Sequence, residues 1–201
     1  LVEFADKKMT YTKQDFENMV MQEGYSRDGA SGSINDYLND QFRGDIEFSY
    51  QISDIITLNN NCENYFGNSE NDSDINAAAA VAEACQKASK SGINFSLADS
   101  DLDGEVDNVF LFVAGLDEAD GGGEDCVWSH MYYLEYSQFK GLAVDGKIIN
   151  NYAISTELKV TDQDETKFTS IGTFCHEYGH ALGLKDMYDT DYKGSGGQGN
   201  G

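Results

Sequence analysis

Two early segments of the chain carry hydrophobic residues at helical spacing between recognisable end signals. Both segments, residues 12–22 and 33–42, start with a Thr or Ser that is followed three residues later by Asp, and both stop two residues before a glycine. A hydroxyl residue with an acid three positions later caps the first turn of a helix, and glycine ends one. We therefore predict two short amphipathic helices. Their expected core-facing residues are Phe16, Met19 and Val20 in the first and Tyr37, Leu38 and Phe42 in the second.

The remaining hydrophobic runs predict one longer helix and three strands. Residues 75–91 contain four consecutive alanines and stop before a glycine, which predicts a closely packed helix. Alternation over 46–52 predicts a strand with one buried face, and residues 152–158 are a second candidate strand. The apolar run 106–114 predicts a central strand that is buried on both faces. Polar and glycine-rich composition predicts loops at 59–74, at 117–125 and over the last eight residues.

One further amphipathic segment, predicted as a helix from about residue 169 to 183, carries a metal-binding pattern. Residues 176–180 read His-Glu-Tyr-Gly-His, an H-E-x-x-H sequence. On a helix, His176 and His180 lie one turn apart on the same face, so both imidazoles can bind one metal ion. Glu177 can then reach a water molecule on that metal. This is the arrangement of a zinc peptidase.

The sequence after the second histidine predicts a third zinc ligand. Gly183 lies three residues beyond His180 and allows a sharp turn in a left-handed backbone conformation. Asp186 follows three residues later, where the redirected chain can bring its carboxylate to the metal. No His or Glu occurs after His180, which leaves Asp186, Asp189 and Asp191 as the downstream oxygen ligands. We therefore predict that Asp186 completes the ligand set formed with the two histidines.

These residues predict hydrolysis of peptide bonds. A catalytic zinc with three protein ligands keeps one position for water and lowers the pKa of that water to about 7. Glu177 accepts its proton, the hydroxide attacks a carbonyl polarised by zinc, and Glu177 returns the proton to the leaving amine. We therefore interpret the chain as a zinc-dependent endopeptidase, with proteins or peptides as substrates. A helix with two coincidental histidines is the alternative.

The extended motif resembles that of the immune inhibitor A type of secreted bacterial metallopeptidases, within the metzincin clan. Residues 176–188 match the family pattern H-E-x-G-H-x-L-G-x-x-D-x-Y. Further similar segments cover most of the chain, namely residues 32–37, residues 101–109, Trp128-Ser129-His130 and Ile171-Gly172. The resemblance implies an α+β fold of the metzincin-like zincin class, with a twisted mixed β-sheet, an active-site helix and backing helices. It also implies that an edge strand of this sheet binds substrate in extended form.

The same resemblance implies a location and a domain arrangement. We expect a bacterial protein that is secreted or lies at the cell surface, with a pro-segment outside residues 1–201. We expect these residues to form one catalytic domain, with an upper subdomain over 1–183 and the start of a truncated lower subdomain over 184–201. Metzincins have a methionine turn beneath the zinc, and the only methionine after the motif histidines, Met187, is too close to form it. We therefore expect the chain to be a fragment of a longer precursor.

The net charge of the chain excludes one class of partner. It has 36 acidic and 13 basic residues, a formal net charge of −23. Such a chain repels phosphates, so we expect no nucleic-acid partner. No hydrophobic run is long enough to span a bilayer. The cysteines contain no C-x-x-C pair and predict no cysteine-only zinc site, while disulfides and free thiols both stay open. They are Cys62, Cys85, Cys126 and Cys175.

An acidic turn ahead of the central strand predicts a second metal site. Residues 99–107 place carboxylates at alternating positions around Gly104, the D-x-D-x-D-G pattern of a calcium loop. Carboxylates this dense need a cation to pack together, so we predict that structural calcium holds the start of the strand. The expected ligands are Asp99, Asp101, Asp103, Glu105 and Asp107. The turn lacks the bidentate glutamate of an EF-hand, and a solvated acidic turn is the alternative.

Two other residues have more than one interpretation, and a third is expected to pack against the core. His130 is interpreted as a structural hydrogen-bonding residue, with a fourth zinc ligand or a latency element as the alternative. Tyr188 could support the oxyanion of the transition state or pack in the core. Cys175 is expected on the buried side of the motif helix. For the whole chain, the alternatives to an enzyme are a catalytically silent binding protein on a peptidase scaffold and a calcium-stabilised adhesion module that carries zinc.

Overall fold

A computed structural model describes residues 1–70, 73–161 and 163–186. The helices are α1 (Lys13–Met21), α2 (Ile34–Gln41), α3 (Glu63–Phe66), α4 (Ala77–Lys90) and α5 (Ile171–Ala181). The strands are β1 (Val2–Glu3), β2 (Ile56–Thr57), β3 (Val109–Leu116), β4 (His130–Tyr133), β5 (Ala143–Val144), β6 (Lys147–Ile148), β7 (Asn151–Val160) and β8 (Thr166–Phe168). Every helix in this part of the chain is too short or too polar to cross a membrane.

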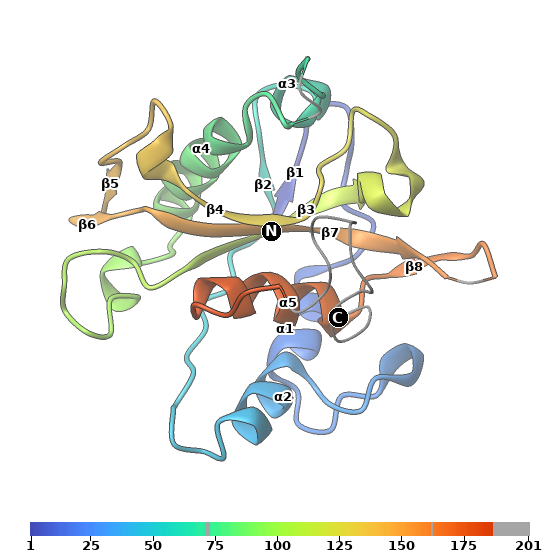
Figure 1. Cartoon of the computed structure of the whole chain (residues 1–201), viewed down its shortest axis with the longest axis vertical. Helices are drawn as coiled ribbons and strands as arrows, with labels where there is room; N and C mark the ends of the chain where they lie inside the picture. Colours follow the sequence, from blue (N-terminus) through green and yellow to red (C-terminus); the bar gives the residue numbers. More distant parts are fainter. Residues whose placement is uncertain (71–72, 162, 187–201) are drawn as a thin grey trace.

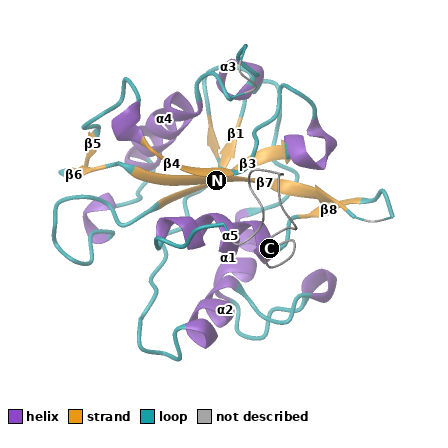
Figure 2. Cartoon of the chain, in the orientation of Figure 1, coloured by secondary structure: helices purple, strands orange, loops and turns teal. Residues whose placement is uncertain are grey.

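Six strands form one mixed sheet. Its order is β2-β1-β3-β7-β4, and β8 also pairs with β7. β3 is parallel to β1 and β7, whereas β4 and β8 are antiparallel to β7. In Figure 1 the sheet is seen on edge, with α3 and α4 on one side and α1, α2 and α5 on the other. Figure 2 shows the same separation of helices and strands into layers. The mixed sheet and its covering helices agree with the prediction.

Each face of the sheet has its own hydrophobic core. Side chains alternate along a strand, so Leu111 and Val113 of β3 join the core beneath α4. Phe110 and Phe112 point the other way and pack against Phe174 of α5, with ring centroids 4.3 and 5.9 Å apart. The predicted central strand is therefore confirmed, although it starts three residues later than predicted.

The helix boundaries follow local capping. Thr12 and Asp15 form a reciprocal capping box at the start of α1, and Ser33 and Asp36 form another at the start of α2. Each box satisfies backbone N–H groups that have no partner within the helix. The predicted helices at 12–22 and 33–42 are confirmed. α4 also agrees with its prediction, whereas the predicted loop over 59–74 contains the short α3.

One residue that was predicted to face the core from α2, Tyr37, does not do so. Tyr37 is 43% exposed, and the buried residues of this helix are Ile34 and Leu38. Residues four apart lie on one helix face, so Ile34 and Leu38 define a buried stripe that leaves Tyr37 beside it.

The predicted strand at residues 46–52 is also wrong, because this segment has no regular secondary structure. Phe48, Tyr50 and Ile52 nevertheless pack against the core on the α5 side of the sheet. The alternation of the sequence therefore reports burial of one face and not pairing with a neighbouring strand.

A buried carboxylate ties the amino-terminal segment to the sheet. Glu157 of β7 is fully buried and accepts hydrogen bonds from the backbone N–H groups of Thr10, Tyr11 and Gly115 at 2.9 to 3.3 Å. Burial raises its pKa, and the three N–H donors oppose that shift. These bonds hold the chain entering α1 against the same strand that pairs with β4.

Candidate metal centre and its surroundings

The motif helix α5 presents its two histidines on one face. His176 Nε2 and His180 Nε2 are 3.2 Å apart. Gly183 has φ +89°, a conformation that glycine adopts without strain, and it turns the chain back toward the helix. Asp186 Oδ1 then lies 3.4 Å from His176 Nε2 and 3.3 Å from His180 Nε2. The structure thus brings together all three of the predicted ligands.

These separations fit a tetrahedral metal ion. Nitrogen and oxygen ligands bind zinc at about 2.0–2.1 Å, and two corners of such a tetrahedron are about 3.3–3.4 Å apart. The three donor atoms are 3.2 to 3.4 Å apart. Two imidazole nitrogens and one carboxylate oxygen are also donors that zinc accepts. The donor set therefore suits zinc in both chemistry and spacing.

The turn after α5 also orients one of the histidines. His180 Nδ1 lies 2.9 Å from the backbone oxygen of Leu184. A hydrogen bond from Nδ1–H to this carbonyl leaves the Nε2 lone pair free for a metal. The Leu184 N–H in turn donates to the carbonyl of Gly179 at 3.0 Å. Sequence reasoning missed this contact, for which the only signal was the glycine that makes the turn.

Glu177 lies beside the three ligands and is 6% exposed. Burial is the largest cause that raises its pKa, to about 7. The carboxylates of Asp186 and Asp117 raise it further, whereas the His180 imidazole and a hydrogen bond from the Met131 N–H lower it. A pKa near neutrality suits a group that must both accept and release a proton.

The hydrogen bond from Met131 shows where the sheet edge lies. β4 is the last strand of the sheet and, among the residues described, pairs only with β7. The Leu134 N–H, just after β4, donates to the Asn150 carbonyl on the β7 side. Backbone N–H groups alternate in direction along a strand, so the Met131 N–H, three residues before Leu134, points away from β7. It faces Glu177 and lowers the pKa of that carboxyl group. The open edge of β4 therefore faces the carboxylate beside the metal cluster.

His130 and Cys175, which were also singled out from the sequence, lie apart from the metal cluster. His130 is opposite Ile154 in the β4–β7 register, which places it on the face away from α5, and its Nδ1 lies 2.7 Å from the Trp128 carbonyl. Cys175 is partly buried against the core on the α5 side. All four cysteines are free thiols. Tyr188, Asp189 and Asp191 lie outside the described residues.

The acidic turn gathers only some of its predicted ligands. Carboxylate oxygens of Asp99, Asp101 and Asp107 lie within 4.8 Å of one another. Asp103 and Glu105 are absent from that group. Asp103 instead accepts the Glu105 N–H at 2.8 Å, and Glu105 accepts a hydrogen bond from an asparagine side chain at 3.3 Å.

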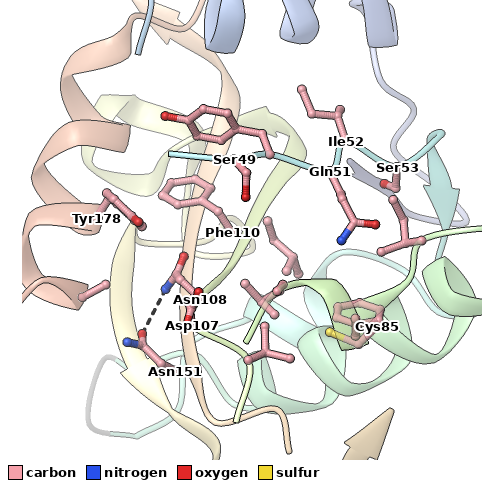
Figure 3. Close-up of a pocket in the computed structure, with 18 of the residues that line it drawn as sticks. Ser49, Gln51, Ile52, Ser53, Cys85, Asp107, Asn108, Phe110, Asn151 and Tyr178 are labelled. Atoms are coloured by element: carbon pink, nitrogen blue, oxygen red, sulfur yellow. Dashed lines mark hydrogen bonds between the residues drawn. The ribbon is translucent and has the colours of Figure 1, made fainter. Parts of the chain in front are cut away.

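A cavity of about 670 Å³ lies behind α5, under the segment at 46–53. Figure 3 shows Tyr178 of α5, Phe110 of β3 and a hydrogen bond between Asn108 and Asn151 at its wall. The histidines, the glutamate and the aspartate of the metal cluster do not line it. This cavity is therefore separate from the candidate catalytic centre.

Known proteins are similar to this chain over most of its length. A family model described as the catalytic domain of immune inhibitor A peptidases, family M6, matches residues 4–200. The chain is 30% identical over 217 residues to the pre-pro-metalloprotease PrtV of Vibrio cholerae serotype O1, which covers 96% of the chain and 21% of PrtV. It is 35% identical over 98 residues to immune inhibitor A of Bacillus thuringiensis subsp. alesti, which covers 47% of the chain and 14% of that protein. The chain thus spans about a fifth of the length of PrtV.

Proposed function

The chain belongs to the immune inhibitor A (M6) family of peptidases, and on this basis we propose that it is a zinc-dependent endopeptidase that hydrolyses peptide bonds in proteins. The observation that supports zinc most directly is the 3.2 to 3.4 Å spacing among the donor atoms of His176, His180 and Asp186. These residues would hold the ion, and Glu177 would be the catalytic residue.

Glu177 would carry the proton transfers of the reaction. When bound, zinc supplies Lewis acidity toward water and toward the scissile carbonyl. The Glu177 carboxylate accepts a proton from the attacking water and delivers it to the leaving amine. Its burial and its hydrogen bond from the Met131 N–H hold it at the open edge of β4. Tyr188 remains our candidate for support of the transition state.

A substrate would bind as an added strand on β4. The unpaired edge of this strand offers backbone groups to an extended peptide, the usual way in which a sheet edge captures a peptide. The scissile bond would then lie between the β4 edge and α5. We also propose that residues 1–183 form the upper subdomain of a metzincin-like catalytic domain, with residues 184–201 beginning the lower one.

We further propose that the protein is secreted by a bacterium. This rests on the relatives, one of which is named a pre-pro-metalloprotease of Vibrio cholerae. A pro-segment outside residues 1–201 belongs to the same proposal.

Replacement of Glu177 by Ala tests the catalytic proposal. The variant should bind about one equivalent of zinc and lose peptide cleavage by at least about 10²–10⁴-fold, because general acid–base catalysis contributes that much. Cleavage is measured on an unfolded protein substrate and zinc by atomic absorption. His180→Ala is the matched variant and should lose zinc as well. Retained cleavage in Glu177→Ala would contradict the mechanism, and zinc-loaded wild-type protein without cleavage would favour a silent binding protein.

We propose structural calcium at the acidic turn, with Asp99, Asp101 and Asp107 as its ligands. Asp99 Oδ1 is buried and has no hydrogen-bond partner among the described residues. Lys147 forms an ion pair with the other oxygen of Asp99 and lowers its pKa, so one charge is already balanced. The Asp103 and Glu105 carboxylates would shape the loop and not bind the ion.

A calcium titration tests this site. Protein treated with EDTA and restored with zinc should show a higher melting temperature as calcium is added, because an ion that binds only the folded state stabilises it. Asp107→Asn should reduce this response. An unchanged melting temperature over millimolar calcium would count against the site.

A further inference from the structure

Residues of β4 and of the first turn of α4 line a cavity of about 680 Å³. Because α4 and α5 lie on opposite sides of the sheet (Figure 1), this cavity is on the side away from α5. We propose that this cavity binds the side chain of a lysine or arginine in the substrate peptide. The proposal rests on the proposed peptidase function and adds a specificity site to it. The residues that carry the argument are Asp74, Trp128, His130, Tyr132, Phe139 and Tyr152.

The first observation is a buried carboxylate that lacks a partner. The Asp74 side chain is 7% exposed, and its Oδ1 has no hydrogen-bond partner among the described residues. Its other contacts are a hydrogen bond from the Trp128 N–H and a 3.7 Å approach of His130 Nδ1. A buried carboxylate oxygen without a donor is costly. An ammonium or guanidinium group in the cavity would bring the opposite charge to this carboxylate, at the small part of its side chain that stays exposed.

The cavity walls suit the rest of a basic side chain. Trp128 and Tyr132 are 58% and 50% exposed, so their rings are accessible at the mouth. Tyr152 lies deeper, with its ring in edge contact with His130 at 5.8 Å between centroids. Aromatic faces attract cations, and Phe139 offers apolar surface to the aliphatic stem of Lys or Arg.

The local charge favours a cation over an anion. No Lys or Arg lines the cavity in the described part of the chain, and burial lowers the pKa of His130, which keeps it neutral. Burial is the largest cause that raises the pKa of Asp74, to about 7, and the carboxylates of Glu118 and Asp117 raise it further. The start of α4 contributes the partial positive charge of a helix terminus, roughly half a unit. Three carboxylates outweigh it.

The position of the cavity connects it to the reaction. His130 and Tyr132 lie opposite Ile154 and Tyr152 of β7, so they share the face on which the cavity lies. Met131 between them donates its N–H to Glu177 at the open edge. A peptide added to this edge alternates as β4 does, with one set of side chains toward α5 and the other toward the cavity. The second set contains the residue that the cavity selects.

Matched peptides test the proposal on the zinc-loaded protein. Substrates that differ only in Lys, Arg, norleucine, Gln or Glu at each position around one cleavage site are compared by kcat/KM. At one position on the cavity side, Lys and Arg should exceed norleucine by roughly 10- to 100-fold, the range of a hydrogen bond between charged groups. Asp74→Asn should remove most of this preference. Glu124→Gln, which removes a nearby exposed carboxylate outside the cavity, should retain it.

Binding to the inactive Glu177→Gln protein separates this inference from the proposed function. The Lys peptide should bind more tightly than the norleucine peptide by a similar factor, measured by calorimetry, and Asp74→Asn should abolish the difference. Cleavage without a preference for a basic residue overturns the specificity site and leaves the peptidase intact. Cleavage that prefers a substrate Glu on the cavity side, where the start of α4 would attract it, does the same. If no peptide is cleaved, the proposed function fails, and equal binding of the two peptides then overturns the site as well.

Discussion

Asp74 and Glu177 are buried acids on opposite sides of β4, and burial raises the pKa of each to about 7. Asp74 lies outside the metal cluster, so the effect of its ionisation on stability does not depend on a bound metal ion. A carboxyl group with a raised pKa in the folded state holds a proton that the unfolded chain has already released. The protonated Asp74 therefore contributes its full stability to the fold below about pH 4, and this stability is lost as the pH rises toward 7.

We expect Asp74→Asn to stabilise the protein at pH 8 and to have little effect at pH 4. The gain is at most about 4 kcal/mol, since three pKa units correspond to about that much. The measurement is the free energy of unfolding in urea at both pH values. In the control Glu124→Gln, the free energy of unfolding relative to the wild type should not increase from pH 4 to pH 8. An equal loss of stability in Asp74→Asn at both pH values would refute the argument.

At the scale of single elements, helix capping decides where the amino-terminal helices begin. Ser33 is fully buried and its hydroxyl accepts the Asp36 N–H at 3.1 Å. Ser33→Ala should lower the free energy of unfolding by about 0.5–2 kcal/mol. Ser31→Ala, at an exposed position two residues earlier, should change it by less than about 0.5 kcal/mol. Equal effects of the two substitutions would show that the cap is unimportant.

Elements governed by neighbouring residues were predictable from the sequence, and those governed by distant contacts were not. The capped helices and α5 depend on residues within one turn, and so does the return of Asp186 after Gly183. β1 and β2 are two residues long and exist only through their pairing with each other and with β3. Glu157 meets its partners at residues 10 and 11 across almost 150 positions of sequence. Asp74 lay in a predicted loop, and nothing in its local sequence indicated a buried, unpartnered carboxylate.

Over the whole molecule, the sheet separates two kinds of chemistry. The metal cluster and Glu177 lie on the α5 side, and the acidic, aromatic cavity lies on the α4 side. β4 is the strand that both share, because its open edge contacts Glu177 while its outward side chains line the cavity. A peptide on this edge would therefore be held on both faces at once.

The same open edge is a liability in the protein without substrate. Among the described residues one edge of β4 has no strand partner, and this edge can pair with that of another copy and begin aggregation. The net charge of −23 opposes this encounter, since like-charged molecules repel. As carboxylates become protonated near pH 4, that repulsion fades. We expect light scattering to rise sharply as the pH falls toward 4 and to rise less in Tyr132→Lys. Equal scattering by both proteins would place the aggregation elsewhere. Colloidal stability of this fold would then depend on its acidity as much as on its core.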